Sequence, residues 1–188
     1  MDRRQKKTRE AIFDAFSELL SKKQYSKITV GEIIECADVG RATFYAHFET
    51  KDFLLKSLCE ELFCHIFDAV DHQREQHKHI FDCDAPSSVL LHLLEHLKKN
   101  DRNILDLLVS ENNELFVRYF KDGLRQLVKE RIAQKLCENS VMAPESFVVN
   151  HISASFVETV RWWIDAGMRQ SPEELLGYFL SVNDGVVI

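Results

Sequence analysis

Apolar residues recur every three or four positions through most of this 188-residue chain, and this spacing is the strongest constraint on its fold. Such a repeat puts apolar side chains on one face of an α-helix, which buries that face against a neighbour. No segment shows a convincing alternation of period two bounded by turn residues, and six Gly and three Pro leave few breaks. The sequence therefore predicts an all-α protein.

The apolar stripes locate the helices along the chain. The first stripe predicts a helix from about residue 5 to 22, and a longer helix begins at Lys51. Two helix starts carry the capping-box pattern, a hydroxyl residue followed by Glu three positions later, and we expect Pro144 in the first turn of another helix. The capping boxes are Thr29 with Glu32 and Ser171 with Glu174, and the later stripes lie within 90–97, 104–109, 116–136 and 148–163. Together these signals indicate about nine helices.

Charge divides the chain into two unlike parts. The net charge is −6, but residues 1–51 hold ten Lys and Arg against eight Asp and Glu, whereas the remainder holds fourteen against twenty-two. We therefore expect different partners for the two parts, with an anionic partner for the first. A basic cluster at the N-terminus either lies along phosphates or is simply a solvated end. It comprises Arg3, Arg4, Lys6, Lys7 and Arg9.

Several classes of protein are disfavoured by the sequence. The five cysteines include no C-x-x-C pair, which argues against a disulfide framework and a zinc ribbon. No apolar run approaches the roughly 20 residues of a membrane span, and no apolar segment follows the N-terminal charges. We therefore expect a cytoplasmic protein with no membrane partner. The chain also has no G-x-S-x-G, P-loop, G-x-G-x-x-G or H-E-x-x-H motif, so we expect no enzyme, no catalytic residue and no cofactor.

Residues 29–54, TVGEIIECADVGRATFYAHFETKDFL, carry the functional signal. Two short helices joined by a three- or four-residue turn can set the second helix against base edges in the DNA major groove. Phe44 and Phe48, at positions i and i+4, are expected to face a small core with Ile33 and Val39. The other faces then present side chains suited to phosphate oxygens and base edges, namely Arg41, Thr43, Tyr45 and His47.

The same segment resembles the TetR family of transcriptional regulators. The shared residues are Thr29-Val30, Ile33, Ala37, Val39, Ala42-Thr43-Phe44-Tyr45, His47-Phe48, Lys51-Asp52 and Leu54. Three positions depart from the family pattern: Ile34 where Ala is common, Asp38 where Gly is usual in the turn, and Gly40 where Ser often caps the recognition helix. Asp tolerates left-handed backbone and Gly is an acceptable N-cap, so the turn remains compatible with these residues. The rest of the chain resembles the family in helical layout and in the RWWIDAGM-x-x-SPEEL stretch.

The resemblance implies a three-helix DNA-binding domain at residues 1–50 and a helical ligand-binding and dimerisation domain at 51–188. It implies a ligand-responsive repressor that binds double-stranded, palindromic operator DNA as a homodimer. An activator or coactivator of the same family is the alternative. Arg41 is expected to read bases, and the remaining DNA-binding residues to position the protein. The full set is Thr29, Gly40, Arg41, Ala42, Thr43, Tyr45, His47 and Lys51.

The second part of the chain carries the regulatory expectations. The segments 145–167 and 172–182 are predicted to form the dimer interface, because 147–164 is apolar on more than one face. A small-molecule effector of unspecified identity is expected among aromatic and apolar residues of the larger domain. The pocket residues that we predict are Phe67, Leu94, Phe116, Phe120, Phe156 and Trp163.

A metal-responsive sensor is the remaining alternative, although we assign no residue as a metal ligand. His92 and His96 share one helix face at i and i+4, and Cys64 and Asp68 have the same spacing. His72, His77 and His79 lie near Cys83 in the sequence. Exposed polar helix faces produce such pairs by chance, so the sequence favours the regulator without metal.

Overall fold

The chain was analysed as a computed structural model, which describes residues 3–70, 89–100, 103–109, 113–138 and 143–183. Within these residues the secondary structure is entirely helical, as the sequence predicted. One 3-10 turn, η1 (Tyr25–Lys27), accompanies the α-helices. These are α1 (Arg3–Lys22), α2 (Val30–Cys36), α3 (Arg41–His47), α4 (Lys51–Val70), α5 (Val89–Lys99), α6 (Ile104–Val109), α7 (Glu114–Glu138), α8 (Glu145–Asp165) and α9 (Pro172–Val182).

Helix boundaries follow local chemistry. Both predicted capping boxes are present: the hydroxyls of Thr29 and Ser171 accept from the backbone N–H of Glu32 and Glu174. Pro144 differs from expectation, because it is the extended N-cap residue of α8, with φ −57° and ψ 141°, and not part of its first turn. Its fixed φ suits either position, but ψ near 141° leaves it outside the helix.

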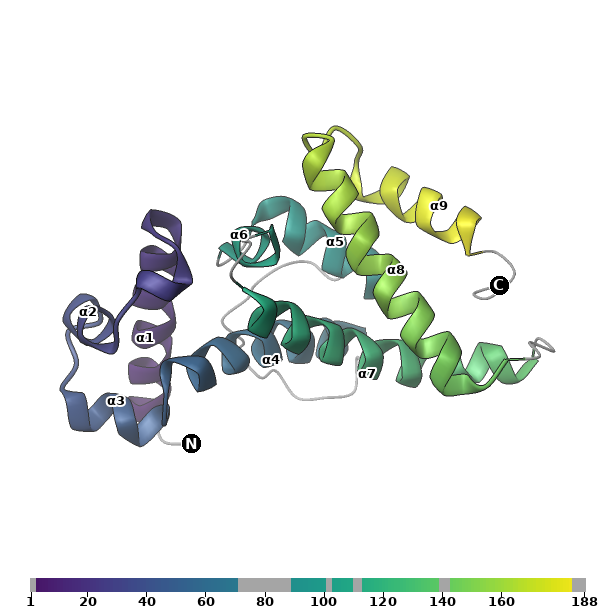
Figure 1. Ribbon diagram of the computed structural model, residues 1–188. Coiled ribbons are helices and arrows are strands. Elements are labelled where there is room, and N and C mark those ends of the chain that lie inside the picture. The colour runs from purple at the N-terminus through teal and green to yellow at the C-terminus, as the bar shows by residue number, and fades with distance from the viewer. Residues whose placement is uncertain (1–2, 71–88, 101–102, 110–112, 139–142, 184–188) are drawn as a thin grey trace.

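The helices form a small group and a larger group joined by α4. Helices α1 to α3 pack together at one end, and α4 leads away from them beneath α7, which α8 crosses (Figure 1). Helix α9 folds back along α5 and α8. No helix among the described residues is long and apolar enough to cross a membrane.

A continuous apolar core runs through both groups. In the small group Phe13, Phe16, Ile33, Phe44 and Phe48 are fully buried, and the rings of Phe13 and Phe48 meet edge to face at 5.4 Å. The predicted inward faces of the helix-turn-helix are therefore confirmed. In the large group the core continues along α4, α5, α7 and α8, so α4 contributes to both parts.

Two polar contacts fasten α1 to the large group. The Arg9 guanidinium lies 3.1 Å from the Glu61 carboxylate on α4, and it also lies over the rings of Phe13 and Phe48. The side-chain amide of Asn103 donates to the backbone oxygen of Ser17 at 2.6 Å. These contacts fix the orientation of the small group relative to α4 and α6.

Candidate nucleic-acid interface

The turn between α2 and α3 sets the direction of the recognition helix. Asp38 has a φ of 51°, in the left-handed region that Asp tolerates better than most residues. The N–H of Val39 donates to the Ile34 oxygen at 3.0 Å. Gly40 is the N-cap of α3, and its oxygen accepts from the Phe44 N–H at 3.0 Å. Asp38 and Gly40 are therefore both compatible with the turn, as the sequence predicted.

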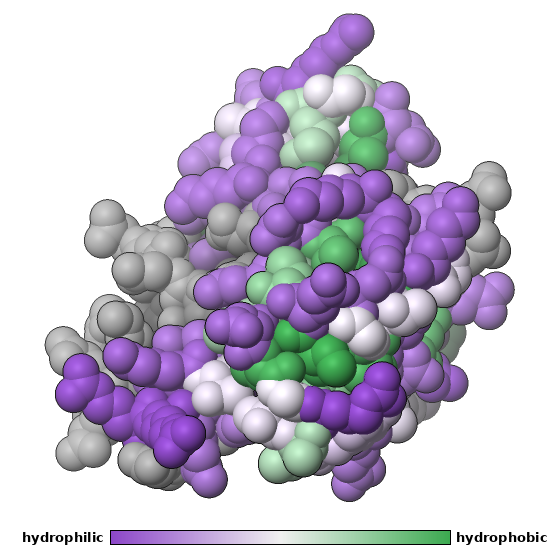
Figure 2. Space-filling model, turned by 90° about the vertical axis from the view of Figure 1, so that its left-hand side faces the viewer, coloured by the Kyte–Doolittle hydropathy of each residue, from purple (hydrophilic) through white to green (hydrophobic). Residues whose placement is uncertain are grey.

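Helix α3 turns a polar face to solvent. Arg41, Ala42 and Thr43 are exposed and Tyr45 is 44% exposed. His47 is half-buried beside Phe48. Because Phe44 and Phe48 are fully buried, the exposed side chains project from a helix that is held against α1 and α2. Hydrophilic side chains cover most of this end of the molecule, with a smaller apolar area among them (Figure 2).

Thr29 and Lys51, the two predicted contacts outside α3 and its cap, have internal partners. Thr29 is exposed, and its hydroxyl belongs to the capping box of α2. The Lys51 ammonium donates to the backbone oxygens of Tyr25 at 2.9 Å and Ile28 at 2.7 Å, and it lies over the Tyr25 ring. Partial burial lowers the pKa of Lys51, and the neighbouring Asp52 opposes that shift. Lys51 thus joins the start of α4 to the segment before α2, a role that its sequence position did not reveal.

The fold leaves part of the N-terminal basic cluster exposed and turns part of it towards the protein. Arg3, Arg4 and Lys7 are exposed on the first turns of α1. Arg9 turns instead towards Glu61 and the small core. Of this cluster, the exposed cations are therefore those of the first two turns of α1.

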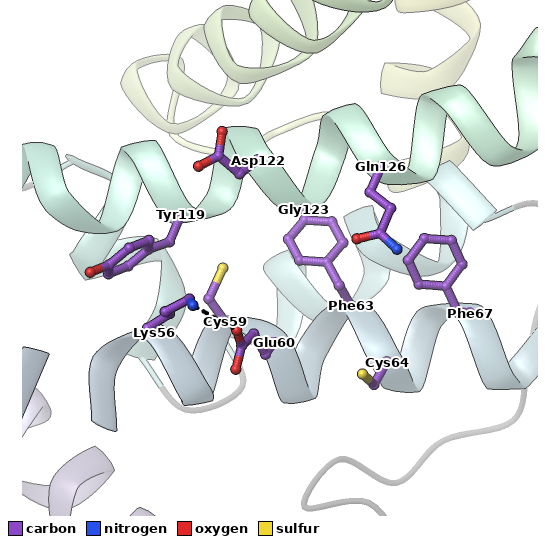
Figure 3. Close-up of a pocket in the computed structure, with 10 residues that line it drawn as sticks. All are labelled: Lys56, Cys59, Glu60, Phe63, Cys64, Phe67, Tyr119, Asp122, Gly123 and Gln126. Carbon is purple, nitrogen blue, oxygen red and sulfur yellow. Dashed lines mark ion pairs between the residues drawn. The ribbon is translucent and has the colours of Figure 1, made fainter. Parts of the chain in front are cut away.

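A cavity of about 230 Å³ lies between α4 and α7 (Figure 3). Phe63, Phe67 and Tyr119 form its apolar walls, and Lys56 pairs with Glu60 at 3.3 Å along α4. Burial raises the pKa of the Cys59 thiol at the cavity wall. Of the six pocket residues predicted from the sequence, Phe67 lines this cavity. The other predicted pocket residues, Leu94, Phe116, Phe120, Phe156 and Trp163, are buried in the core.

The structure brings together one of the pairs that were weighed for the metal-sensor alternative, although no metal ligand was predicted. His92 and His96 are buried on α5, and His65 of α4, which the sequence analysis missed, packs against both rings. Burial and the neighbouring His96 and His65 lower the pKa of His92 to about 4. Cys64 is exposed on α4. The side chain of Asp68 and the whole of His72, His77, His79 and Cys83 lie outside the described residues.

Large apolar side chains are exposed on the last two helices. Phe147 is 63% exposed and Trp162 49% on α8, and Tyr178 is 50% exposed on α9. A shallow groove between α8 and α9 includes Trp162 and Tyr178. Exposed aromatic residues gathered on one pair of helices indicate a surface for association.

Comparison with known proteins gives two family matches. Residues 12–58 match the family described as "Bacterial regulatory proteins, tetR family", and residues 84–184 match a "Transcriptional regulator C-terminal region" of TetR type. A TetR transcriptional regulator from Streptococcus agalactiae is 37% identical, covers 96% of each chain and superimposes with a TM-score of 0.71. The transcriptional regulator FadR from Bacillus subtilis, solved in complex with stearoyl-CoA, shares the fold at 20% identity and a TM-score of 0.60, over 94% of this chain and 96% of FadR.

A curated relative extends beyond the length of this chain. The uncharacterized HTH-type transcriptional regulator YxbF of Bacillus subtilis is 25% identical over an alignment of 195 positions, which covers 98% of this chain and 46% of YxbF. The chain spans less than half of the length of the curated relatives that it matches. The regulator class expected from the sequence is confirmed by these matches. The chain therefore belongs to the TetR family of bacterial regulatory proteins.

Proposed function

We propose that this chain is a sequence-specific DNA-binding transcriptional regulator that works in the cytoplasm as a repressor. Residues 1–50 would form the DNA-binding domain and residues 51–188 the regulatory and dimerisation domain. The observation that carries the proposal is the geometry of α3: buried Phe44 and Phe48 fix the helix while Arg41, Thr43 and Tyr45 remain exposed on it. A short helix held in this way can enter the major groove.

Each predicted contact has a chemical role in this proposal. Arg41, in the first turn of α3, can make the bidentate contact to guanine that is the commonest specific base contact. Thr43, Tyr45 and His47 can donate to phosphate oxygens. At Gly40 and Ala42 the absence of a long side chain lets the backbone of α3 approach the DNA closely.

The test is selection of bound fragments from a random DNA pool, followed by titration of the recovered operator and of a scrambled duplex. We expect a palindrome. Arg41→Ala should cost about 1–3 kcal/mol on the operator and relax one base preference per half-site. Arg118→Ala, an exposed arginine on α7, is the matched control and should change neither affinity. Equal losses on both duplexes for Arg41→Ala would make Arg41 a phosphate contact and overturn its reading role.

We infer that α8 and α9 form the homodimer interface. The exposed aromatic side chains of Phe147, Trp162 and Tyr178 support this, because one protomer leaves them uncovered. Two helices from each chain would make a four-helix interface with twofold symmetry. Light scattering should give a dimer for the wild type and for Gln126→Glu, and a monomer for Trp162→Glu. A wild-type monomer at micromolar concentration would overturn the proposal.

We infer that a small effector binds in the cavity between α4 and α7. The apolar walls and the polar groups of Lys56, Glu60 and Gln126 at its edge are typical of ligand sites. Its volume is below that of sites for drug-sized molecules, so the first candidates are small metabolites. A bound compound should raise the melting temperature of the wild type and weaken operator binding. Phe67→Ala should reduce that stabilisation, and an unchanged response in this variant would exclude the cavity.

A further inference from the structure

A cluster of three histidines lies in the core where α4 meets α5, outside the proposed DNA-binding surface and the cavity. His65, His92 and His96 are 8%, 0% and 1% exposed. Their ring centroids form an almost equilateral triangle, with separations of 5.0, 4.8 and 4.9 Å. One ring nitrogen from each histidine lies within 4.8 Å of the others. Polar rings are rarely gathered in an apolar core, because removing them from water costs free energy.

The spacing of the ring nitrogens matches the geometry of a metal site. Zinc binds imidazole nitrogen at about 2.0–2.1 Å in tetrahedral geometry, which puts neighbouring ligand nitrogens about 3.3 Å apart. The Nε2 atoms of His92 and His96 are 3.2 Å apart. This edge of a tetrahedron therefore exists already, and the ring nitrogen of His65 has to move closer to the pair to supply the third corner.

The helical placement of the three residues supports a preformed site. His92 and His96 are one turn apart on α5, so both rings project from the same face. His65 comes from the neighbouring helix, and α4 and α5 are packed together along this face. Ligands on packed helices are held more rigidly than ligands on loops, which favours a defined coordination geometry.

We propose that His65, His92 and His96 bind a divalent transition metal of the zinc class. Three neutral imidazoles favour zinc, copper, nickel or iron over magnesium and calcium, which prefer oxygen ligands. The ring nitrogen that binds directs its lone pair to the metal, and the ring proton then occupies the other nitrogen; in His92 and His96 the facing atoms are the Nε2 atoms. Three protein ligands leave a fourth tetrahedral position for water or an external ligand.

The direct test is titration of the purified, metal-free full chain with Co²⁺, which gives visible absorption bands in tetrahedral coordination. We expect one strongly bound ion per chain that Zn²⁺ displaces. His65→Gln, His92→Gln and His96→Gln should each weaken binding by more than about 100-fold, beyond the effect expected for outer-shell partners. His151→Gln removes an exposed histidine on α8 and is the matched control, so it should bind like the wild type.

A second measurement uses the wild type alone and so does not depend on the folding of the variants. In protein labelled with ¹⁵N-histidine, Zn²⁺ should shift the ring nitrogens of these three residues together and leave those of His151 unchanged. The proposal is overturned if the wild type gives no tetrahedral cobalt spectrum. It is also overturned if the three buried-histidine variants bind cobalt as tightly as the wild type, or if zinc shifts other histidines and not these.

Discussion

At the scale of single residues, Thr29 has both a structural and a proposed functional role. Its hydroxyl caps α2, and loss of such a cap costs about 1 kcal/mol. Ser171 forms the same capping box on α9, far along the chain from α3. We expect Thr29→Ala and Ser171→Ala to lower the free energy of unfolding by similar amounts in urea denaturation. Only Thr29→Ala should also weaken operator binding, and equal DNA affinity of the two variants would reduce Thr29 to a cap.

The capping box of α2 also predicts a dependence on pH. Hydrogen bonds from Lys23 and from the backbone and hydroxyl of Thr29 lower the pKa of Glu32 to about 2. A depressed carboxyl pKa contributes stability above its unfolded value of 4.5, and this contribution is lost as the pH falls towards 2. The stability difference between the wild type and Thr29→Ala should therefore shrink over this range. Denaturation at stepwise lower pH measures it, and a constant difference would contradict the assignment.

Lys51 supports the fold through its two carbonyl contacts. Hydrogen bonds from a charged donor are worth about 1.5–3 kcal/mol, so Lys51→Met should destabilise the protein clearly. Lys56→Met, five residues further along α4 at the edge of the cavity, removes an exposed pair with Glu60 and should cost less than about 0.5 kcal/mol. Urea denaturation compares the two variants.

DNA titration then separates the two roles of Lys51. A phosphate contact predicts that Lys51→Met lowers the salt slope of binding by about one per protomer, on operator and scrambled DNA alike. An unchanged slope together with reduced stability would make Lys51 purely structural. Lys56→Met should leave the slope as it is.

At the scale of elements, Gly123 sets how closely α7 approaches α4. A Cβ atom at this position would lie 2.3 Å from the Phe63 ring (Figure 3). Gly123→Ala should therefore cost about 1–3 kcal/mol through overpacking. Gly31→Ala on α2 is the control, because its nearest new contact is an ordinary 3.7 Å and Ala is the better helix former.

A double-mutant cycle tests the cause of this loss. In a Phe63→Leu background the smaller side chain can move aside, so the added cost of Gly123→Ala should fall by at least half. Residues in direct contact show such coupling, whereas independent sites give additive losses. Strict additivity would mean that Phe63 is not the obstacle.

The helices themselves could largely be predicted from the sequence, but the contacts between neighbouring helices could not. Periodicity located α1, α4 and α6 to within about two residues, because the apolar repeat depends only on neighbouring positions along one helix. It also paired His92 with His96, which share a helix. Periodicity could not show that His65 lies beside this pair, because the register between two packed helices depends on the shapes of the side chains along both helices. The Lys51 contacts and the close approach at Gly123 escaped prediction for the same reason.

At the scale of the whole molecule, α4 links the proposed DNA-binding domain, the cavity and the histidine cluster. Its first residue is tied to the segment before α2 through the Tyr25 and Ile28 oxygens, and Glu61 contacts α1 through Arg9. Further along, the same helix forms one wall of the cavity and contributes His65. We therefore expect a displacement of α4 to move the helix-turn-helix together with it, and in a dimer to change the separation of the two recognition helices.

This connection predicts that zinc and operator DNA affect each other's binding, provided that both proposed sites exist. The ligand nitrogens lie up to 4.8 Å apart and must draw in to about 3.3 Å around the metal, so zinc should shift α4 against α5. We expect the operator affinity to change by about 5- to 150-fold on zinc binding. Thermodynamic linkage requires that operator DNA change the zinc affinity by the same factor. Fluorescence anisotropy with labelled operator and zinc competition against a chelator measure the two factors.

Control variants separate the predicted coupling between zinc and operator DNA from the two proposals on which it rests, the zinc site and the DNA-binding function. His92→Gln should bind operator like the metal-free wild type and show no response to zinc, whereas Arg118→Ala, the control for operator binding, should respond like the wild type. If the protein binds operator neither with zinc nor without it, the proposed DNA-binding function fails. If zinc occupies the three histidines and operator affinity stays constant, the site is structural and α4 does not transmit its occupancy to the helix-turn-helix.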